Sequence, residues 1–288
     1  MPTSPRQRGD QLRTFPRERW DQGHAFSRGC RGNGPCLLFP RPWGEGRVRV
    51  GVPTKPAISR QRARSPQDKD LRRAHLIEAA TRLFADADFD AVTIARVAEA
   101  AGVAKGTAYI YFATKETLFV ELVRAELTQW LAALAATLKR LRSNRPATAV
   151  PVAIAKSLAN RPVLCRLLVL LHSVIEPKID EATARGFKLF LRDVLLQASD
   201  LIAAKIPGVT PSAAATLVLQ THALVISITQ LASPPPVIAR VVAADPSLHM
   251  MQIDFEAFLT LTLTTLVRGT LTQPLTQELP GCPNPAGV

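Results

Sequence analysis

The order of apolar and polar positions from residue 71 to residue 127 follows a helical period. In its first segment, four apolar residues share one face of a 3.6-residue repeat: Leu76, Ala80, Leu83 and Phe84. This spacing predicts an amphipathic helix of about four turns. The cluster of aspartates that begins at Asp86 favours bonds between side chain and backbone over further helix, so the helix is expected to end there.

Two short helices joined by a tight turn are predicted next. Thr93 stands as an N-cap before apolar positions spaced for a helix. Gly102 falls where a chain that leaves a helix commonly needs a left-handed residue. A further short helix opens near Ala104 and turns Ala108 and Phe112 inward. Two short helices around a Gly-containing turn form a helix-turn-helix, whose second helix enters the major groove of DNA.

Helical patterns continue to residue 271, so the sequence predicts an all-α fold. Thr114 is expected to cap a long helix that ends near Arg142. Prolines then separate the later segments. Helices are predicted at about residues 147–159, 162–175, 178–205, 211–232, 235–244 and 252–270.

Three of these later segments are apolar on more than one face: 164–175, 213–231 and 255–267. A single layer of helices in a monomer cannot bury such segments. They therefore form a deep core, line a cavity or contact a second chain, and dimerisation is the expected outcome.

Charge is concentrated near the N-terminus. Residues 1–70 contain 15 Lys or Arg and 6 Asp or Glu, and the whole chain has a net charge of +13. Residues 1–66 are rich in Arg, Pro and Gly without a helical or strand period, so we expect a disordered extension. An alternative is that translation begins near Val50 or Val52. Arg60, Arg62 and Arg64 are either a basic arm for the minor groove or a solvated linker.

The sequence gives little support for a metal site, an enzyme active site or a membrane span. His24, Cys30 and Cys36 lack the fourth ligand and the close spacing of a zinc site, so no metal is predicted. The sequence contains no Gly-rich phosphate loop or nucleophile elbow, which disfavours an enzyme and gives no reason to expect a cofactor. Residues 206–239 contain no Asp, Glu, Lys or Arg, but Gln220, His222 and several prolines favour a buried helix over a membrane span.

The run from Thr93 to Leu118, TIARVAEAAGVAKGTAYIYFATKETL, resembles the signature of the tetracycline-repressor (TetR) family of bacterial regulators. The resemblance implies that Lys105, Thr107 and Tyr109, with Gly106 among them, reach the DNA from the recognition helix. It also implies that Thr93, Tyr111 and Lys115 hold phosphates. These side chains can bond base edges or phosphate oxygens. One departure is Ala108, where the family more often has a larger aliphatic residue.

The resemblance also implies a role for the later helices. Family members pair through two C-terminal helices per subunit, which correspond here to about residues 211–232 and 252–270. The other helices would form a small-molecule pocket. His172, Gln220 and His222 are polar residues in apolar helices, and each is either an effector contact or a satisfied core residue.

We therefore expect four segments. These are an extension (1–66), a helix-turn-helix DNA-binding domain (67–127), an effector-binding and dimerisation domain (128–271) and a flexible tail (272–288). The predicted protein is a cytoplasmic homodimeric repressor that binds double-stranded operator DNA and leaves it when a small apolar effector binds. An enzyme and a membrane-associated helical protein are the alternatives.

Overall fold

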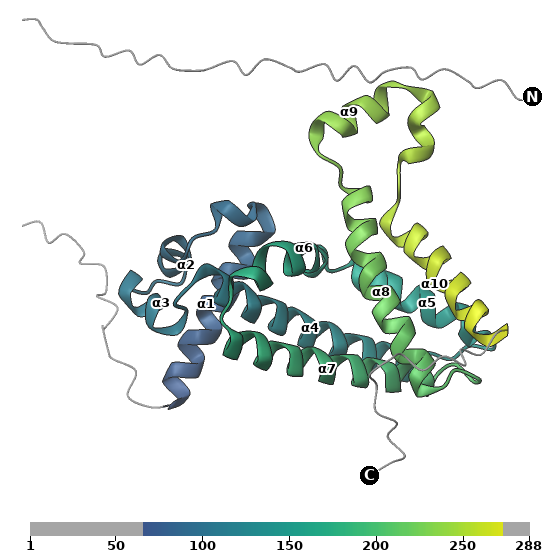
Figure 1. Cartoon of the computed structure of the whole chain (residues 1–288), viewed down its shortest axis with the longest axis horizontal. Coiled ribbons are helices and arrows are strands. Elements are labelled where there is room, and N and C mark those ends of the chain that lie inside the picture. Colours follow the sequence, from purple (N-terminus) through teal and green to yellow (C-terminus); the bar gives the residue numbers. More distant parts are fainter. Residues whose placement is uncertain (1–65, 273–288) are drawn as a thin grey trace, which may run out of the picture. The chain divides into compact units, whose positions relative to one another are not determined.

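The computed structural model describes residues 66–272, and the secondary structure of this part is entirely helical. The fold is all-α, as the sequence predicts (Figure 1). Residues 1–65 of the predicted extension, with Arg60, Arg62 and Arg64 and with His24, Cys30 and Cys36, lie outside the described residues. The same holds for the tail beyond Thr272.

Four helical elements form the head: α1 (Pro66–Asp86), η1 (Phe89–Ala91), α2 (Ile94–Ala100) and α3 (Lys105–Tyr111). Helix α1 begins five residues before the periodic pattern, because proline at a first helical position needs no partner for the missing N–H. The stripe predicted from the period is fully buried at Leu76, Ala80 and Phe84. The head is therefore organised around the apolar face of α1.

Helix α4 (Lys115–Arg140) connects the head to the rest of the chain. Thr114 caps it as predicted, since its hydroxyl accepts the N–H of Thr117 at 3.1 Å and Thr117 bonds back to the Thr114 N–H. Phe119 on α4 lies edge-on to Phe84 and Phe89, with ring centroids 5.2 and 4.6 Å away. The helix continues without a break through the predicted boundary at residue 127, so that boundary stays a prediction.

The remaining helices follow the predicted order: α5 (Pro146–Ala159), α6 (Pro162–Leu170), α7 (Glu181–Ala203), α8 (Pro211–Ala232), α9 (Pro236–Ala244) and α10 (Phe255–Thr272). Proline occupies the first position of α5, α6, α8 and α9, where its fixed φ favours the start of a helix. Helices α4 and α7 run side by side, and α10 packs against α5 and α8 (Figure 1).

The segment predicted as one helix at 162–175 changes its geometry at residue 171. Helix α6 passes into a π-helical turn, η2 (Leu171–Ile175), and a 3-10 turn, η3 (Glu176–Lys178). Pro177 has no N–H and its ring collides with a carbonyl of the preceding turn, so an α-helix cannot continue through it. Asp180 then caps α7 by accepting the N–H of Thr183 at 2.9 Å, which sets the start of α7 later than residue 178.

Helix α8 is the one helix within residues 66–272 that is long and apolar enough to cross a membrane. The α5 and Pro162–Lys178 segments pass that test only as a pair bent by 84°. Helix α8 contacts α6, α7 and α10, and 33% of its apolar window is buried within this chain. Between α8 and α10 the chain makes an excursion through α9 and η4 (Pro246–Met251), which pack on each other (Figure 1).

Candidate DNA-binding and effector sites

The turn between α2 and α3 has the geometry that the sequence predicts. The Thr93 hydroxyl accepts the N–H of Arg96 at 3.3 Å and caps α2. Gly102 has a φ of 67°, in the left-handed region. The N–H of Val103 then bonds the carbonyl of Ala98 at 2.9 Å and returns the chain toward the core. These contacts fix the angle between the two helices of the helix-turn-helix.

Helix α3 presents one face to solvent. Ala108 and Phe112 are buried against the head, and Thr107 is half-buried. Lys105, Gly106 and Tyr109 are exposed, and the Lys105 ammonium lies 5.9 Å from the centre of the Tyr109 ring. The exposed face therefore carries a cation, an aromatic hydroxyl and a glycine that permits close approach, which are suitable groups for base edges and phosphates.

Ile110 also belongs to this face, although the sequence pattern did not lead us to predict it as a DNA contact. Its side chain is 83% exposed, which is unusual for isoleucine in a well-packed head. The helical period does predict this exposure, because residue 110 lies nearly opposite both of the inward-facing residues, Ala108 and Phe112, on a helix. An exposed aliphatic group on a recognition helix can contact the methyl group of thymine.

The two predicted phosphate contacts at the end of α3 and the start of α4 are less exposed. Tyr111 is half-buried and packs on the core. The Lys115 ammonium lies 3.7 Å from the centre of the Phe89 ring and 3.7 Å from a carboxylate oxygen of Asp90. Burial lowers the pKa of Lys115, and the charge of Asp90 opposes that shift. Their roles at phosphates, like that of Thr93, stay predictions.

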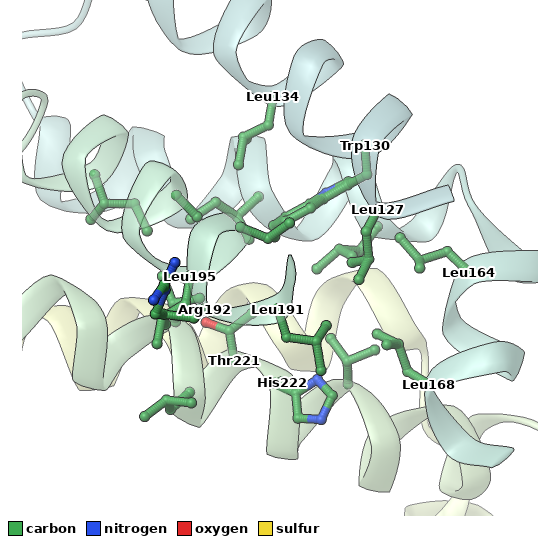
Figure 2. A pocket seen from close by; sticks show the side chains of 18 of the residues that line it. Leu127, Trp130, Leu134, Leu164, Leu168, Leu191, Arg192, Leu195, Thr221 and His222 are labelled. Carbon is green, nitrogen blue, oxygen red and sulfur yellow. The ribbon is translucent and has the colours of Figure 1, made fainter. Parts of the chain in front are cut away.

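A cavity of about 480 Å³ lies among α4, α5, α6, α7 and α8, which is large enough for a small organic ligand. Its wall is mainly aliphatic, with the Trp130 indole on one side and Thr221 and His222 on the other (Figure 2). Trp130 is held by a hydrogen bond from its Nε1–H to the Ser157 hydroxyl, 3.0 Å away. The apolar lining residues are Leu127, Trp130, Leu134, Ile154, Leu158, Leu164, Leu168, Leu191, Val194, Leu195, Ala198, Ile202, Val218, Leu219 and Val225.

Two of the three predicted effector residues line this cavity. His172 and His222 do so, whereas Gln220 is absent from the lining and the next residue, Thr221, takes part instead. The Thr221 hydroxyl donates to the Leu217 carbonyl at 2.7 Å, as a polar group inside a helix commonly does. Lys188 and Arg192 of α7 also line the cavity and were not predicted.

His172 and His222 contact each other across 50 positions of sequence. Their Nε2 atoms are 2.9 Å apart, so one ring must donate and the other accept. Nδ1 of His172 lies 3.2 Å from Glu176, which also accepts from the Lys188 ammonium at 2.7 Å. Burial, and then the charges of His172 and Lys188, lower the pKa of His222. Burial would raise the pKa of Glu176, but its hydrogen bonds from Lys188 and His172 lower it.

The cavity is connected to the head through α6. Leu164 and Leu168 of α6 line the cavity, and Arg166, between them, reaches the C-terminus of α1. Its guanidinium donates to three backbone carbonyls, those of Phe84, Ala85 and Ala87, at 2.9, 3.1 and 2.8 Å. Helix α1 has no basic residue in its own last turn, so Arg166 supplies the cation that favours a helix C-terminus.

Metal and thiol chemistry are not supported by this part of the chain. Within residues 66–272, no group of three or more His, Cys, Asp and Glu side chains could hold a metal ion. Cys165 is buried, and burial raises the pKa of its thiol to about 11. It is therefore protonated and weakly reactive at neutral pH.

Several solved structures are similar to this chain at low sequence identity. The fatty acid degradation regulator FadR from Bacillus halodurans is 14% identical, with 72% of this chain and 98% of that chain covered and a TM-score of 0.48. A TetR transcriptional regulator from Rhodococcus sp. RHA1 is 18% identical, with 72% and 98% covered and a TM-score of 0.47. A possible TetR family regulator from Streptomyces coelicolor A3(2) is 17% identical, with 69% and 98% covered and a TM-score of 0.48. Among curated proteins, no sequence matches significantly.

Two family models match the chain in consecutive segments. Residues 76–122 match the bacterial regulatory proteins of the tetR family, and they contain the helix-turn-helix described above. Residues 124–274 match the tetracyclin repressor-like C-terminal domain, and they contain the cavity. The two segments together account for nearly all of the described helices, and the chain therefore belongs to the TetR family of bacterial transcriptional regulators.

Proposed function

We propose that this protein is a cytoplasmic, homodimeric repressor that leaves its operator when a small, mainly apolar molecule occupies the cavity. The observation that carries the proposal is the position of the 480 Å³ cavity. It lies against α4 and α6, and both of these helices also contact α1 of the head. A ligand that fits only one arrangement of α6 would therefore favour one position of the head.

The DNA-binding part of the proposal uses the exposed face of α3. TetR-family regulators are soluble DNA-binding proteins and are generally not enzymes. Lys105, Tyr109 and Ile110 are the exposed groups of α3 that suit the major groove. Few charges are placed there, so affinity depends on these contacts more than on a broad basic field.

Dimerisation is supported by apolar groups that a single chain leaves in solvent. Leu231 on α8 and Phe258, Leu261 and Leu271 on α10 are exposed. So are five residues of α9 and η4: Val237, Ile238, Val241, Met250 and Met251. A soluble protein rarely leaves such a large apolar surface uncovered. A two-fold dimer through α8 and α10 would cover the exposed groups on these two helices and present two recognition helices to a near-palindromic operator.

Effector release requires only a modest coupling. If the ligand-bound and DNA-bound arrangements differ, a coupling of about 1–3 kcal/mol weakens operator binding by about 5- to 150-fold. The link from the cavity to α1 through Arg166 is where such a difference would pass to the head.

The proposal is tested by binding to DNA that flanks the protein's own coding region. We would measure fluorescence anisotropy at two salt concentrations for wild type, Lys105→Ala and Tyr109→Ala. Lys156→Ala, an exposed lysine on α5, is the matched control. Salt-sensitive binding that is lost in the α3 variants and kept in the control supports α3 as the DNA contact. Equal binding by all four proteins would exclude it.

Dimerisation has its own test in sedimentation velocity. The chain has a mass of 31.3 kDa, and the proposal expects a species of twice that mass. Leu261→Glu should shift it to monomer and abolish cooperative operator binding, while Leu196→Glu, at an exposed position of α7, should not. A wild-type monomer that still protects a symmetrical footprint would refute the dimer.

A further inference from the structure

The polar groups of the cavity are not distributed evenly over its wall. Five lining residues are polar: His172, Lys188, Arg192, Thr221 and His222. Three of them reach solvent, since the side chains of His172, Lys188 and Arg192 are 47, 56 and 60% exposed. The aliphatic lining includes Leu134, Leu164 and Ala198, which are fully buried. The cavity therefore has a mainly apolar interior and a mainly polar mouth, where Leu219 is also exposed.

Both charged groups at this mouth are cations. Lys188 and Arg192 lie one turn apart on α7, and no carboxylate from residues 66–272 lines the cavity. Each cation has an acidic partner outside the lining. The Lys188 ammonium is 2.7 Å from Glu176, and Nε and Nη2 of Arg192 are 2.9 and 2.7 Å from Asp193. These carboxylates hold the two cations in place without facing the cavity.

The ion pairs leave hydrogen-bond donors available to a ligand. An ammonium has three donors, and Glu176 occupies one of those on Lys188. Asp193 engages Nε and Nη2 of Arg192, so the N–H groups on Nη1 remain. A cationic ligand would meet like charges at this mouth. A ligand with only an apolar surface would leave the donors to water.

We infer that the effector is an amphiphile whose alkyl part fills the cavity and whose anionic oxygen headgroup, a carboxylate or a phosphate, binds Lys188 and Arg192. This inference rests on the proposed function, because it names the ligand class of the same cavity. Charge-assisted hydrogen bonds to anionic oxygens are roughly twice as strong as neutral ones. Lys188 and Arg192 are thus specificity-determining residues, and the aliphatic wall supplies affinity for the tail.

Direct binding without DNA tests the inference. Four probes share one C12 tail and differ in their headgroup: dodecanoate, dodecyl phosphate, dodecanol and dodecylamine, each used below the concentration at which it forms micelles or separates from water. We would measure Kd by calorimetry for the full chain. One or both anionic probes should bind at least about tenfold more tightly than the alcohol, and the amine should bind most weakly.

Two variants connect the preference to the named residues. Lys188→Met and Arg192→Met keep an unbranched side chain and remove the cation. Each should weaken binding of the anionic probe much more than binding of dodecanol, and retained dodecanol binding shows that the cavity remains intact. Lys178→Met, an exposed lysine of η3 outside the lining, is the control.

The outcomes separate this inference from the proposed function. Equal binding of alcohol and anions, tighter binding of the amine, or no binding of any probe would overturn the inference. Selective anion binding that Lys188→Met and Arg192→Met do not change would overturn it as well. Selective anion binding that depends on Lys188 and Arg192 would support the inference. If the bound anion nevertheless left operator affinity unchanged, only the proposed release of the operator by an effector would be wrong. The ratio of the Kd values of dodecanoate and dodecyl phosphate shows whether a carboxylate or a phosphate headgroup is preferred.

Discussion

The guanidinium of Arg166 lies over the aromatic ring of Phe84, with its Cζ 4.4 Å from the ring centre, and donates to the Phe84 carbonyl at 2.9 Å. The two residues are 82 positions apart in sequence. Phe84 is fully buried in the head, and Leu164 and Leu168, which precede and follow Arg166 by two positions on α6, line the cavity. This contact joins α6, one of the helices that line the cavity, to the last turn of α1.

Removing this contact should weaken both stability and coupling. We expect Arg166→Met to lower the free energy of unfolding by about 2 kcal/mol, because three carbonyls at the end of α1 lose a charged donor. Urea unfolding measures this change. Operator affinity with and without a bound effector should then differ less than in wild type, because α6 no longer holds α1.

Arg142→Met is the matched control for Arg166. Within residues 66–272, the guanidinium of Arg142 donates to the local carbonyl of Lys139 at 3.1 Å and to no carbonyl of another helix. Its removal should leave stability within about 0.5 kcal/mol of wild type. If Arg166→Met behaves like Arg142→Met in both measurements, the link through α6 plays no part in coupling.

Two glycines of the helix-turn-helix should respond in opposite directions to alanine. A Cβ at either Gly102 or Gly106 meets no atom within 4 Å, so sterics with neighbours do not decide the outcome. Gly102→Ala should cost about 1–2 kcal/mol, because its φ is 67°. Gly106→Ala lies within α3 and should stabilise the head by up to about 1 kcal/mol.

Gly106→Ala also distinguishes an effect on folding from an effect on DNA binding. If Gly106 permits close approach to the operator, Gly106→Ala should bind DNA more weakly although it unfolds at a higher urea concentration. Equal or tighter operator binding by Gly106→Ala would show that this glycine has no role at the DNA. Denaturation and anisotropy on the same samples give both values.

Ile110→Ala should weaken operator binding by about tenfold without loss of stability, because the side chain is exposed in the free protein. The loss should be confined to operators with thymine at the contacted position. Val152→Ala, at a half-exposed apolar position of α5, should leave binding unchanged. A similar operator affinity for Ile110→Ala and wild type would remove Ile110 from the DNA-binding face.

The histidine pair predicts a dependence of stability on pH. Burial lowers the pKa of His222 from its ordinary value of 6.5, and His172, Lys188 and Glu176 are the titratable groups that face it. The unfolded chain therefore binds a proton at His222 before the folded chain does. The free energy of unfolding should fall as pH decreases from about 6.5 toward the lowered pKa of folded His222.

His222→Gln should flatten this part of the pH profile, since glutamine does not titrate. His75→Gln, at an exposed position of α1, should retain the wild-type slope. Glu176 adds a separate loss below its ordinary pKa of 4.5, because its pKa is also lowered in the folded state. Urea unfolding at several pH values between 7.5 and 5 measures the slope, and equal slopes for wild type and His222→Gln would contradict the assignment.

The sequence by itself determined the local structure of this protein. Thr93 and Thr114 cap the helices that they precede, Gly102 adopts the left-handed turn, and prolines begin four of the later helices. These features depend on atoms within a few residues of each other, so composition and spacing are sufficient to predict them. The exposed face of α3 follows in the same way from the helical period.

Only the tertiary structure decided which polar groups meet. No local pattern places His172 against His222, or Arg166 on the carbonyls of α1, because these contacts join residues 50 to 82 positions apart. It also decided that Thr221 and not Gln220 faces the cavity, and that Lys188 and Arg192 stand at its mouth. A helix turns about 100° per residue, so a small rotation fixed by packing between helices determines which of two neighbouring side chains faces a ligand.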